Sequence, residues 1–167
     1  MSPTVDIDAE LTFRVYDRPM KDADRQRVLF VCTHNSARSQ MAEGLLRAWA
    51  GDRFEVASAG TEATGVRPEA IRVMAEIGID IGSQTSKTLE PFLGQRIGWL
   101  ITVCDQAREA CPTLPGVRRQ AHWNVEDPSQ IVGDEAARLE AFRAARDDLG
   151  ERIGEFVLEA DTHPATG

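Results

Sequence analysis

The stretch from Val28 to Gly44 reads VLFVCTHNSARSQMAEG. Its first four residues form a continuous apolar run containing β-branched side chains, which is typical of a strand buried on both faces of a parallel sheet. A polar loop follows, and apolar residues then recur at helical spacing, at Met41, Ala42, Leu45, Leu46, Ala48 and Trp49. Gly51 suits the C-terminal end of that helix. The stretch therefore predicts a buried strand, a tight loop and an amphipathic helix in immediate succession.

The same alternation continues along the chain. Further strands are expected over 54–59, 99–103 and 118–123, and further helices over 68–77, over 106–110 and from Asp134 to Phe156. Glycines at 150 and 154 predict weak final turns in the last helix. The pattern indicates an α/β fold, a four-stranded parallel sheet with helices on both faces and right-handed crossovers.

Length and composition predict one main domain. The chain has 167 residues, a natural size for a single core. Residues 1–25 are polar, with five Asp and one Glu, apart from one alternating segment, Leu11 to Tyr16, that suits a short strand. We expect an N-terminal arm of unknown role over 1–25, a domain over 26–160 and a tail over 161–167.

Charge and hydropathy exclude several classes of partner. The formal net charge is −8, which argues against nucleic acid because binding to nucleic acid depends on basic surface. No apolar run approaches the roughly 20 residues of a membrane span, and the acidic start does not resemble a secretory signal. We expect a cytoplasmic protein that contacts no membrane. An anionic substrate would need a strong local site on so acidic a chain.

Such a local site is predicted directly after the first strand. Cys32 begins a pattern of Cys, five residues, Arg and Ser that leads into a helix. Backbone N–H groups of a tight loop and of a helix N-terminus converge on one point and favour an anion there. Arg38 can clamp a tetrahedral oxyanion, and the same positive field favours the nucleophilic thiolate form of Cys32.

At this point a family resemblance becomes visible. Val28–Gly44 resembles the signature of arsenate reductases built on the low-molecular-weight protein tyrosine phosphatase fold. The resemblance continues through short segments at Ser58-Ala-Gly, Gly78-Ile-Asp-Ile, Thr102-Val-Cys-Asp, Cys111-Pro, His122-Trp and Asp127-Pro, and covers roughly Arg27 to Phe156. It implies a flavodoxin-like three-layer sandwich and a cytoplasmic oxidoreductase that reduces arsenate to arsenite in arsenic detoxification.

The resemblance also implies roles for individual residues. Cys32 would be the nucleophile, Arg38 the oxyanion clamp and Asp127 the general acid. Asn35 would hold the loop by hydrogen bonds, and the Ser39 hydroxyl would stabilise the thiolate. The implied oxyanion-binding loop comprises Thr33, His34, Asn35, Ser36, Ala37 and Ser39. A simple turn is the alternative for Asp127-Pro128, since that dipeptide favours turns.

Two further cysteines suggest redox chemistry. Cys104 follows the third strand, at the sheet edge where Cys32 is expected, and Cys111 comes seven residues later. A helix between them would separate their Cα atoms by about 10.5 Å along the axis, whereas a disulfide needs about 5.5 Å. The pair therefore suits a relay in which the segment rearranges on oxidation. The resemblance implies a disulfide passed from Cys32–Cys104 to Cys104–Cys111 and reduced by thioredoxin.

Three other readings remain open. A low-molecular-weight phosphatase needs the same loop and acid, but has no use for Cys104 and Cys111 and usually offers an aromatic ring where this chain has Ser129. A non-enzymatic oxyanion-binding protein would need neither the acid nor the thiol pair. A zinc module would draw on ligand types present in the chain, which are Cys32, His34, Cys104, Cys111 and His122.

We expect no cofactor and no metal. Some relatives place an acidic potassium ligand near the position of Lys87, together with residues matching Asn35, Glu43 and Ser58. An ammonium group there could replace the ion, so no potassium requirement is predicted. Ala37 stands where some relatives carry a further cysteine that no step of the relay uses.

Overall fold

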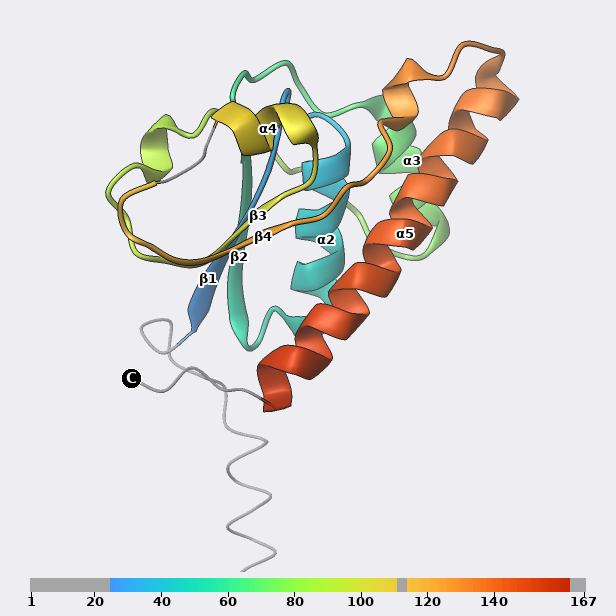
Figure 1. Ribbon diagram of the computed structural model, residues 1–167. Helices are drawn as coiled ribbons and strands as arrows, with labels where there is room; N and C mark the ends of the chain where they lie inside the picture. The colour runs from blue at the N-terminus through green and yellow to red at the C-terminus, as the bar shows by residue number, and fades with distance from the viewer. Residues whose placement is uncertain (1–24, 111–113, 163–167) are drawn as a thin grey trace, which may run out of the picture.

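The computed structural model describes residues 25–110 and 114–162. Its centre is a sheet of four parallel strands, β1 (Gln26–Cys32), β2 (Phe54–Gly60), β3 (Ile97–Thr102) and β4 (Val117–His122), in the order β2-β1-β3-β4 (Figure 1). In this register Val28 lies between Val56 of β2 and Trp99 of β3. The four predicted strands are confirmed, each shifted or extended at its ends by one to two residues.

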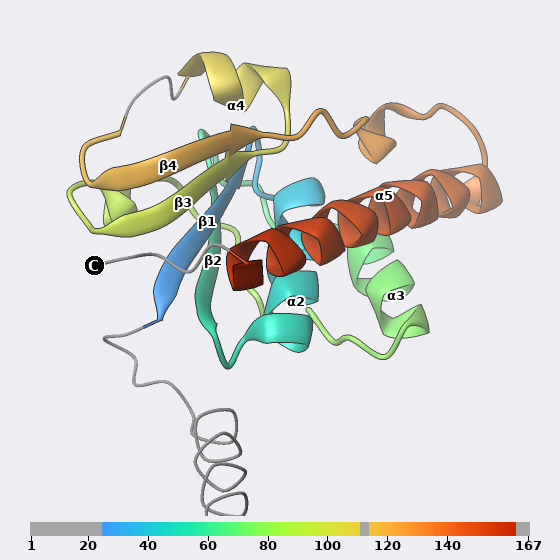
Figure 2. The same cartoon turned by 60° about the horizontal axis from the view of Figure 1, so that its bottom comes forward.

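Helices cover both faces of the sheet, as expected. They are α2 (Arg38–Ala50), α3 (Pro68–Glu76), α4 (Asp105–Ala110) and α5 (Glu135–Thr162), with short 3-10 helices at Glu90–Phe92 and Pro128–Gln130. Helices α2 and α5 pack together on one side, α3 lies against them, and α4 lies on the opposite side near β1 and β3 (Figures 1 and 2). The predicted α/β sandwich is confirmed.

The core forms where the apolar run predicts it. Val28, Leu29, Phe30 and Val31 have no exposed surface, because β1 is flanked by strands on both edges and by helices on both faces. Each such side chain contributes about 1.5–3 kcal/mol by burial. The packing therefore holds strand β1 rigidly, and with it the position of Cys32, from which the following loop begins.

The long helix α5 differs from expectation. The helix is unbroken at Gly150 and Gly154, where weak turns were predicted. It continues past Phe156 to Thr162, which is two residues beyond position 160, the expected end of the domain. A Cβ at Gly150 would lie 3.2 Å from Trp49 Cη2, so the missing side chain lets α5 approach α2 closely. Packing of this kind outweighs the low helix propensity of glycine.

Some predictions fall outside the described residues. They are the short strand at 11–16, most of the N-terminal arm, Cys111 and the end of the tail. No helix in the described ranges has the length and apolar character needed to cross a membrane.

Candidate active site

The predicted site residues that the structure describes gather at the carboxyl end of the sheet. Cys32 ends β1, Cys104 follows β3 by two residues, and Asp127 lies beyond β4. Ligands of open α/β sheets bind at this edge, because the loops leaving neighbouring parallel strands diverge there. The topology therefore brings together residues separated by up to 95 positions in the chain.

The loop after Cys32 has its carbonyl groups turned outward. The carbonyl oxygen of Thr33 accepts from the N–H of Glu62 at 2.9 Å, and that of Ser36 accepts from the N–H of Arg67 at 2.8 Å. Because a trans peptide points its C=O and the following N–H in opposite directions, the N–H groups of His34 and Ala37 face the other way. That orientation makes a cradle for the oxygens of an anion.

Two backbone features allow this tight loop. Asn35 has a φ of +48°, a left-handed conformation that Asn tolerates better than most residues. Gly60, at the end of β2, lies against the loop so closely that a Cβ there would be 2.7 Å from the Asn35 nitrogen and 2.8 Å from the Thr33 oxygen. Only glycine at position 60 leaves room for the loop.

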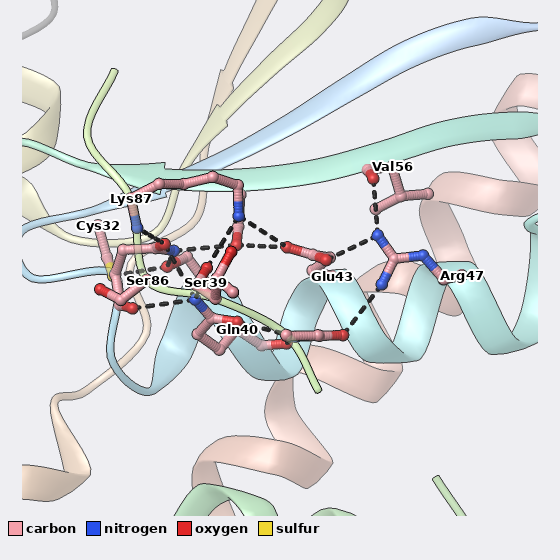
Figure 3. A network of polar contacts seen from close by, with 12 residues as sticks. Cys32, Ser39, Gln40, Glu43, Arg47, Val56, Ser86 and Lys87 are labelled. Atoms are coloured by element: carbon pink, nitrogen blue, oxygen red, sulfur yellow. Dashed lines mark hydrogen bonds and ion pairs between the residues drawn. The ribbon is translucent and has the colours of Figure 1, made fainter. Parts of the chain in front are cut away.

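The Cys32 thiol is buried and carries a hydroxyl partner. Its sulfur is 2.8 Å from Ser39 Oγ, in the first turn of α2 (Figure 3). The Asn35 side chain supplies one hydrogen bond to this serine. Asn35 Oδ1 accepts the backbone N–H of Lys87 at 2.9 Å, so its Nδ2 must be the atom that donates to Ser39 Oγ at 2.8 Å. A Cys32 thiolate has no proton to give, so in that form the serine is the donor and its single proton stabilises the thiolate.

The other hydrogen of the Asn35 amide extends the network into the core. It is donated to Ser58 Oγ at 2.9 Å, and Ser58 donates to Glu43 Oε1 at 2.6 Å. The Glu43 carboxylate is almost fully buried and pairs with Arg47 at 2.6 Å. A buried carboxylate needs such partners to offset its desolvation.

The Lys87 side chain lies beside the buried network. Its Nζ is 3.9 Å from Glu43 Oε1 and donates to the Thr85 carbonyl oxygen at 2.9 Å. The ammonium group therefore neighbours the buried network at the position considered for a potassium ion.

Gln40 is a site residue that sequence reasoning missed. It is fully buried, and its Nε2 lies 2.9 Å from Asn35 Oδ1 and 3.0 Å from the carbonyl oxygens of Asn35 and Thr85. Gln40 thus ties the loop to the segment that precedes Lys87. A neutral polar residue beside apolar Met41, in the first turn after an anion loop, is the signal that could have identified it.

Arg38 and Asp127 meet at the mouth of the cradle. Arg38 donates to the Val125 carbonyl oxygen at 3.0 Å, and its guanidinium lies 3.4 Å from Asp127 Oδ2. Asp127 also accepts from the N–H and the hydroxyl of Ser129, at 2.9 Å and 2.7 Å. Burial raises the pKa of Asp127, but the Ser129 hydrogen bonds and the Arg38 charge outweigh burial and hold it below its ordinary value. The alternative considered for Asp127-Pro128, a turn, does form as a short 3-10 helix with Asp127 at its N-cap, and the Asp127 carboxylate still lies beside Arg38.

Cys104 lies beside the nucleophile loop. It is buried and unpaired, with its sulfur 3.3 Å from Thr33 Oγ1 and 3.4 Å from the backbone nitrogen of Ala107. Thr33 directly follows Cys32 in the sequence, so Cys104 contacts the residue next to the nucleophile. Cys111 lies outside the described residues.

The histidines lie apart from each other. His34 is half exposed, with Nδ1 3.3 Å from Glu62 Oε2, while His122 bonds to Thr102 and Asp105. Within 25–110 and 114–162, no three His, Cys, Asp or Glu side chains converge as metal ligands would. The described part of the site therefore gives no support to the zinc reading.

Comparison with known proteins identifies the family. Residues 27–163 match the family model of low molecular weight phosphotyrosine protein phosphatases, and the chain belongs to this family. Among its relatives, an arsenate reductase of Halalkalibacterium halodurans is 42% identical over 134 residues, which cover 80% of this chain and 96% of the relative. An arsenate reductase of Bacillus subtilis is 40% identical over 130 residues, covering 78% and 94%.

Solved structures agree with this assignment. An arsenate reductase in the oxidized state superposes with a TM-score of 0.66 at 34% identity, covering 80% of this chain and 98% of that chain. A thioredoxin-dependent arsenate reductase of Corynebacterium glutamicum gives 0.65 at 25% identity, covering 85% and 65%. A low molecular weight protein tyrosine phosphatase of T. tengcongensis gives 0.66 at 27% identity, covering 80% and 99%.

Proposed function

We propose that this protein is an arsenate reductase that works through a three-cysteine relay and is re-reduced by thioredoxin. The observation that carries the proposal is the placement of a second thiol, Cys104, against the loop of the nucleophile Cys32. The phosphatase reaction contains no step that uses a second thiol. The relatives named above, at about 40% identity over most of their length, are arsenate reductases.

In the first step the cradle binds arsenate. Arg38 turns from Asp127 toward the oxyanion, where its planar fork can hold two oxygens. Asp127 then loses a positive neighbour and gains a negative one, and both changes raise its pKa, so it takes up a proton. The Cys32 thiolate attacks arsenic, an As–O bond breaks, and Asp127 protonates the departing oxygen, which leaves as water.

The second step reduces arsenic. The Cys104 thiolate attacks the Cys32 sulfur, a sulfur–sulfur bond forms and the sulfur–arsenic bond breaks. The electron pair of that bond stays with arsenic, so As(V) becomes As(III) while two thiols are oxidised to one disulfide. Arsenite leaves the cradle. Cys111 next attacks Cys104 and releases the Cys32 thiolate, and thioredoxin reduces the Cys104–Cys111 disulfide by exchange.

The chemistry requires a compartment in which thiols stay reduced, and we place the protein in the cytoplasm for that reason. None of the steps above requires residues 1–25, which precede β1. We propose that they form an arm leading into the catalytic domain that begins at Gln26, and Arg25 is joined to that domain by a hydrogen bond to the Gly51 carbonyl oxygen at 2.8 Å.

A coupled assay tests the proposal. Purified protein is mixed with arsenate, thioredoxin, thioredoxin reductase and NADPH, and arsenate-dependent NADPH oxidation is expected for the unaltered chain and not for Cys32→Ser. Cys111→Ser should release about one arsenite per chain and stop with Cys32 bonded to Cys104, which peptide mass spectrometry would detect. Normal turnover of Cys111→Ser would contradict the three-cysteine relay.

Phosphatase activity is the second candidate, because the family contains phosphatases with the same cradle and acid. Ser129 bonds to Asp127 and leaves no aromatic ring at that position to hold an aryl substrate. Hydrolysis of p-nitrophenyl phosphate is therefore expected to be weak. Vigorous hydrolysis without any arsenate-dependent oxidation of NADPH would reverse the ranking.

A further inference from the structure

Three side chains, those of Thr102, His122 and Asp105, form a chain of hydrogen bonds that joins the residues on either side of Cys104. Thr102 Oγ1 is 2.8 Å from His122 Nδ1, and His122 Nε2 is 2.9 Å from Asp105 Oδ1. The Asp105 carboxylate oxygen can only accept, so Nε2 carries a proton and donates it. Both ring nitrogens are thus engaged, and the ring orientation is fixed from two sides.

The two ends of this chain of hydrogen bonds differ in how firmly the fold holds them. Thr102 and His122 are paired in the β3–β4 register, and the Thr102 carbonyl oxygen accepts the N–H of Trp123 at 2.8 Å, so this end belongs to the sheet. Asp105 is the first residue of α4, and its side chain is 70% exposed. Helix α4 has only six residues, too few to be stable without tertiary contacts.

Cys104 lies between the two ends. It comes two residues after Thr102 and one before Asp105, so the histidine bridges the backbone on either side of the thiol. In this position the Cys104 sulfur contacts Thr33 and accepts from the Ala107 N–H, which requires the first turn of α4 to be formed. If Asp105 were released, that turn could open and Cys104 could move away from the Cys32 loop.

We propose that His122 is a positioning residue that clamps Asp105 and thereby holds Cys104 beside Cys32. This inference rests on the proposed reductase function, and it concerns the step in which Cys104 attacks the Cys32–arsenic adduct. The clamp keeps the thiol in reach for that attack. Its exposed end can break afterwards, when Cys104 has to leave.

Thiol accessibility tests the clamp without arsenate. The chain has three cysteines, so Cys104 is the sole thiol in a Cys32→Ser/Cys111→Ser background. In that background Asp105→Ala is expected to raise the rate of Cys104 alkylation by iodoacetamide about fivefold, as expected for one lost hydrogen bond in an opening equilibrium. Asp105→Asn keeps an acceptor oxygen and should restore most of the protection.

A matched control is available elsewhere on the surface. Glu135 forms an exposed ion pair with Arg72 at 2.6 Å, between α5 and α3, so Glu135→Ala removes a comparable contact far from Cys104 and should leave alkylation unchanged. An alkylation rate that Asp105→Ala does not change would overturn the proposal. So would an Asp105→Asn variant that is as reactive as Asp105→Ala.

A single-turnover measurement separates the clamp from the reductase function. In a Cys111→Ser background, Asp105→Ala should slow the burst of arsenite about fivefold, while the arsenate concentration at half-maximal burst rate stays the same. A parent that shows no burst overturns the relay and this inference together. A normal parent burst that Asp105→Ala fails to slow overturns the clamp alone.

Discussion

Ser39 Oγ lies 2.8 Å from the Cys32 sulfur and accepts a hydrogen bond from Asn35, so its only proton is available to the Cys32 thiolate. The backbone N–H of Lys87 fixes the orientation of the Asn35 amide. A buried amide thus holds in place the hydroxyl on which the thiolate depends.

Removal of that hydroxyl should impair the thiolate. Hydrogen bonds to charged groups contribute about 1.5–3 kcal/mol, so Ser39→Ala should lower the rate of Cys32 alkylation and of the arsenite burst about 10- to 100-fold. Both rates would be measured in a Cys111→Ser background at neutral pH. Ser83→Ala, at an exposed position, is the control. A variant that keeps the parent rates would contradict the assigned direction of the bond.

Ser129 should set the pH range of the general acid. Its hydrogen bonds help to hold the pKa of Asp127 below the ordinary value, so Ser129→Ala should raise that pKa. The protonated, active acid then persists to higher pH. The alkaline limb of the rate at saturating arsenate, which reports the arsenate-bound enzyme, is expected to move to higher pH, and only part of the way because the Ser129 N–H bond remains. An unmoved limb would show that this limb reports another group.

Lys87 should make added potassium unnecessary. The unaltered protein is expected to reduce arsenate equally well in potassium chloride and in choline chloride. Lys87→Ala leaves the buried Glu43 carboxylate with one positive neighbour fewer, so turnover should fall about tenfold. Potassium, and not choline, should then restore part of it. Equal rates of the variant in both salts, at the parent level, would contradict a role for the ammonium group.

Glu76 should stabilise the packing of α3 on α5 in a pH-dependent way. Hydrogen bonds from Arg143 outweigh the effect of burial and, with Arg146, lower the pKa of Glu76 to about 2. A carboxyl with a depressed folded-state pKa adds stability above its ordinary pKa of about 4.5 and loses it as the pH falls toward 2.

Thermal unfolding as a function of pH checks this linkage. Glu76→Gln should lower Tm at pH 7, and the difference from the parent should shrink as the pH falls from about 4.5 to about 2. Glu151→Gln, exposed on α5, the helix that carries Arg143 and Arg146, serves as the control. A Tm difference that is constant over the acid range would point to packing and not to charge.

The sequence alone determined the order of the strands and helices and the place of the oxyanion-binding loop. Apolar periodicity, which depends only on local geometry, was enough to predict the strands and helices, and the Cys32 to Ser39 pattern was enough to predict an oxyanion cradle. Propensity failed at Gly150, where the absence of a side chain leaves room for Trp49 and lets α5 pack on α2. Local preference is weak compared with tertiary packing.

Only the tertiary structure decided the polar contacts. The network from Cys32 to Glu43, the burial of Gln40 and the bridge through His122 join residues from different elements. Hydrogen bonds need heavy atoms within about 3 Å, and no one-dimensional spacing specifies such distances between separate strands and helices. The residue types at the site can therefore be read along the chain, while their proton directions and partners depend on how the sheet brings those elements together.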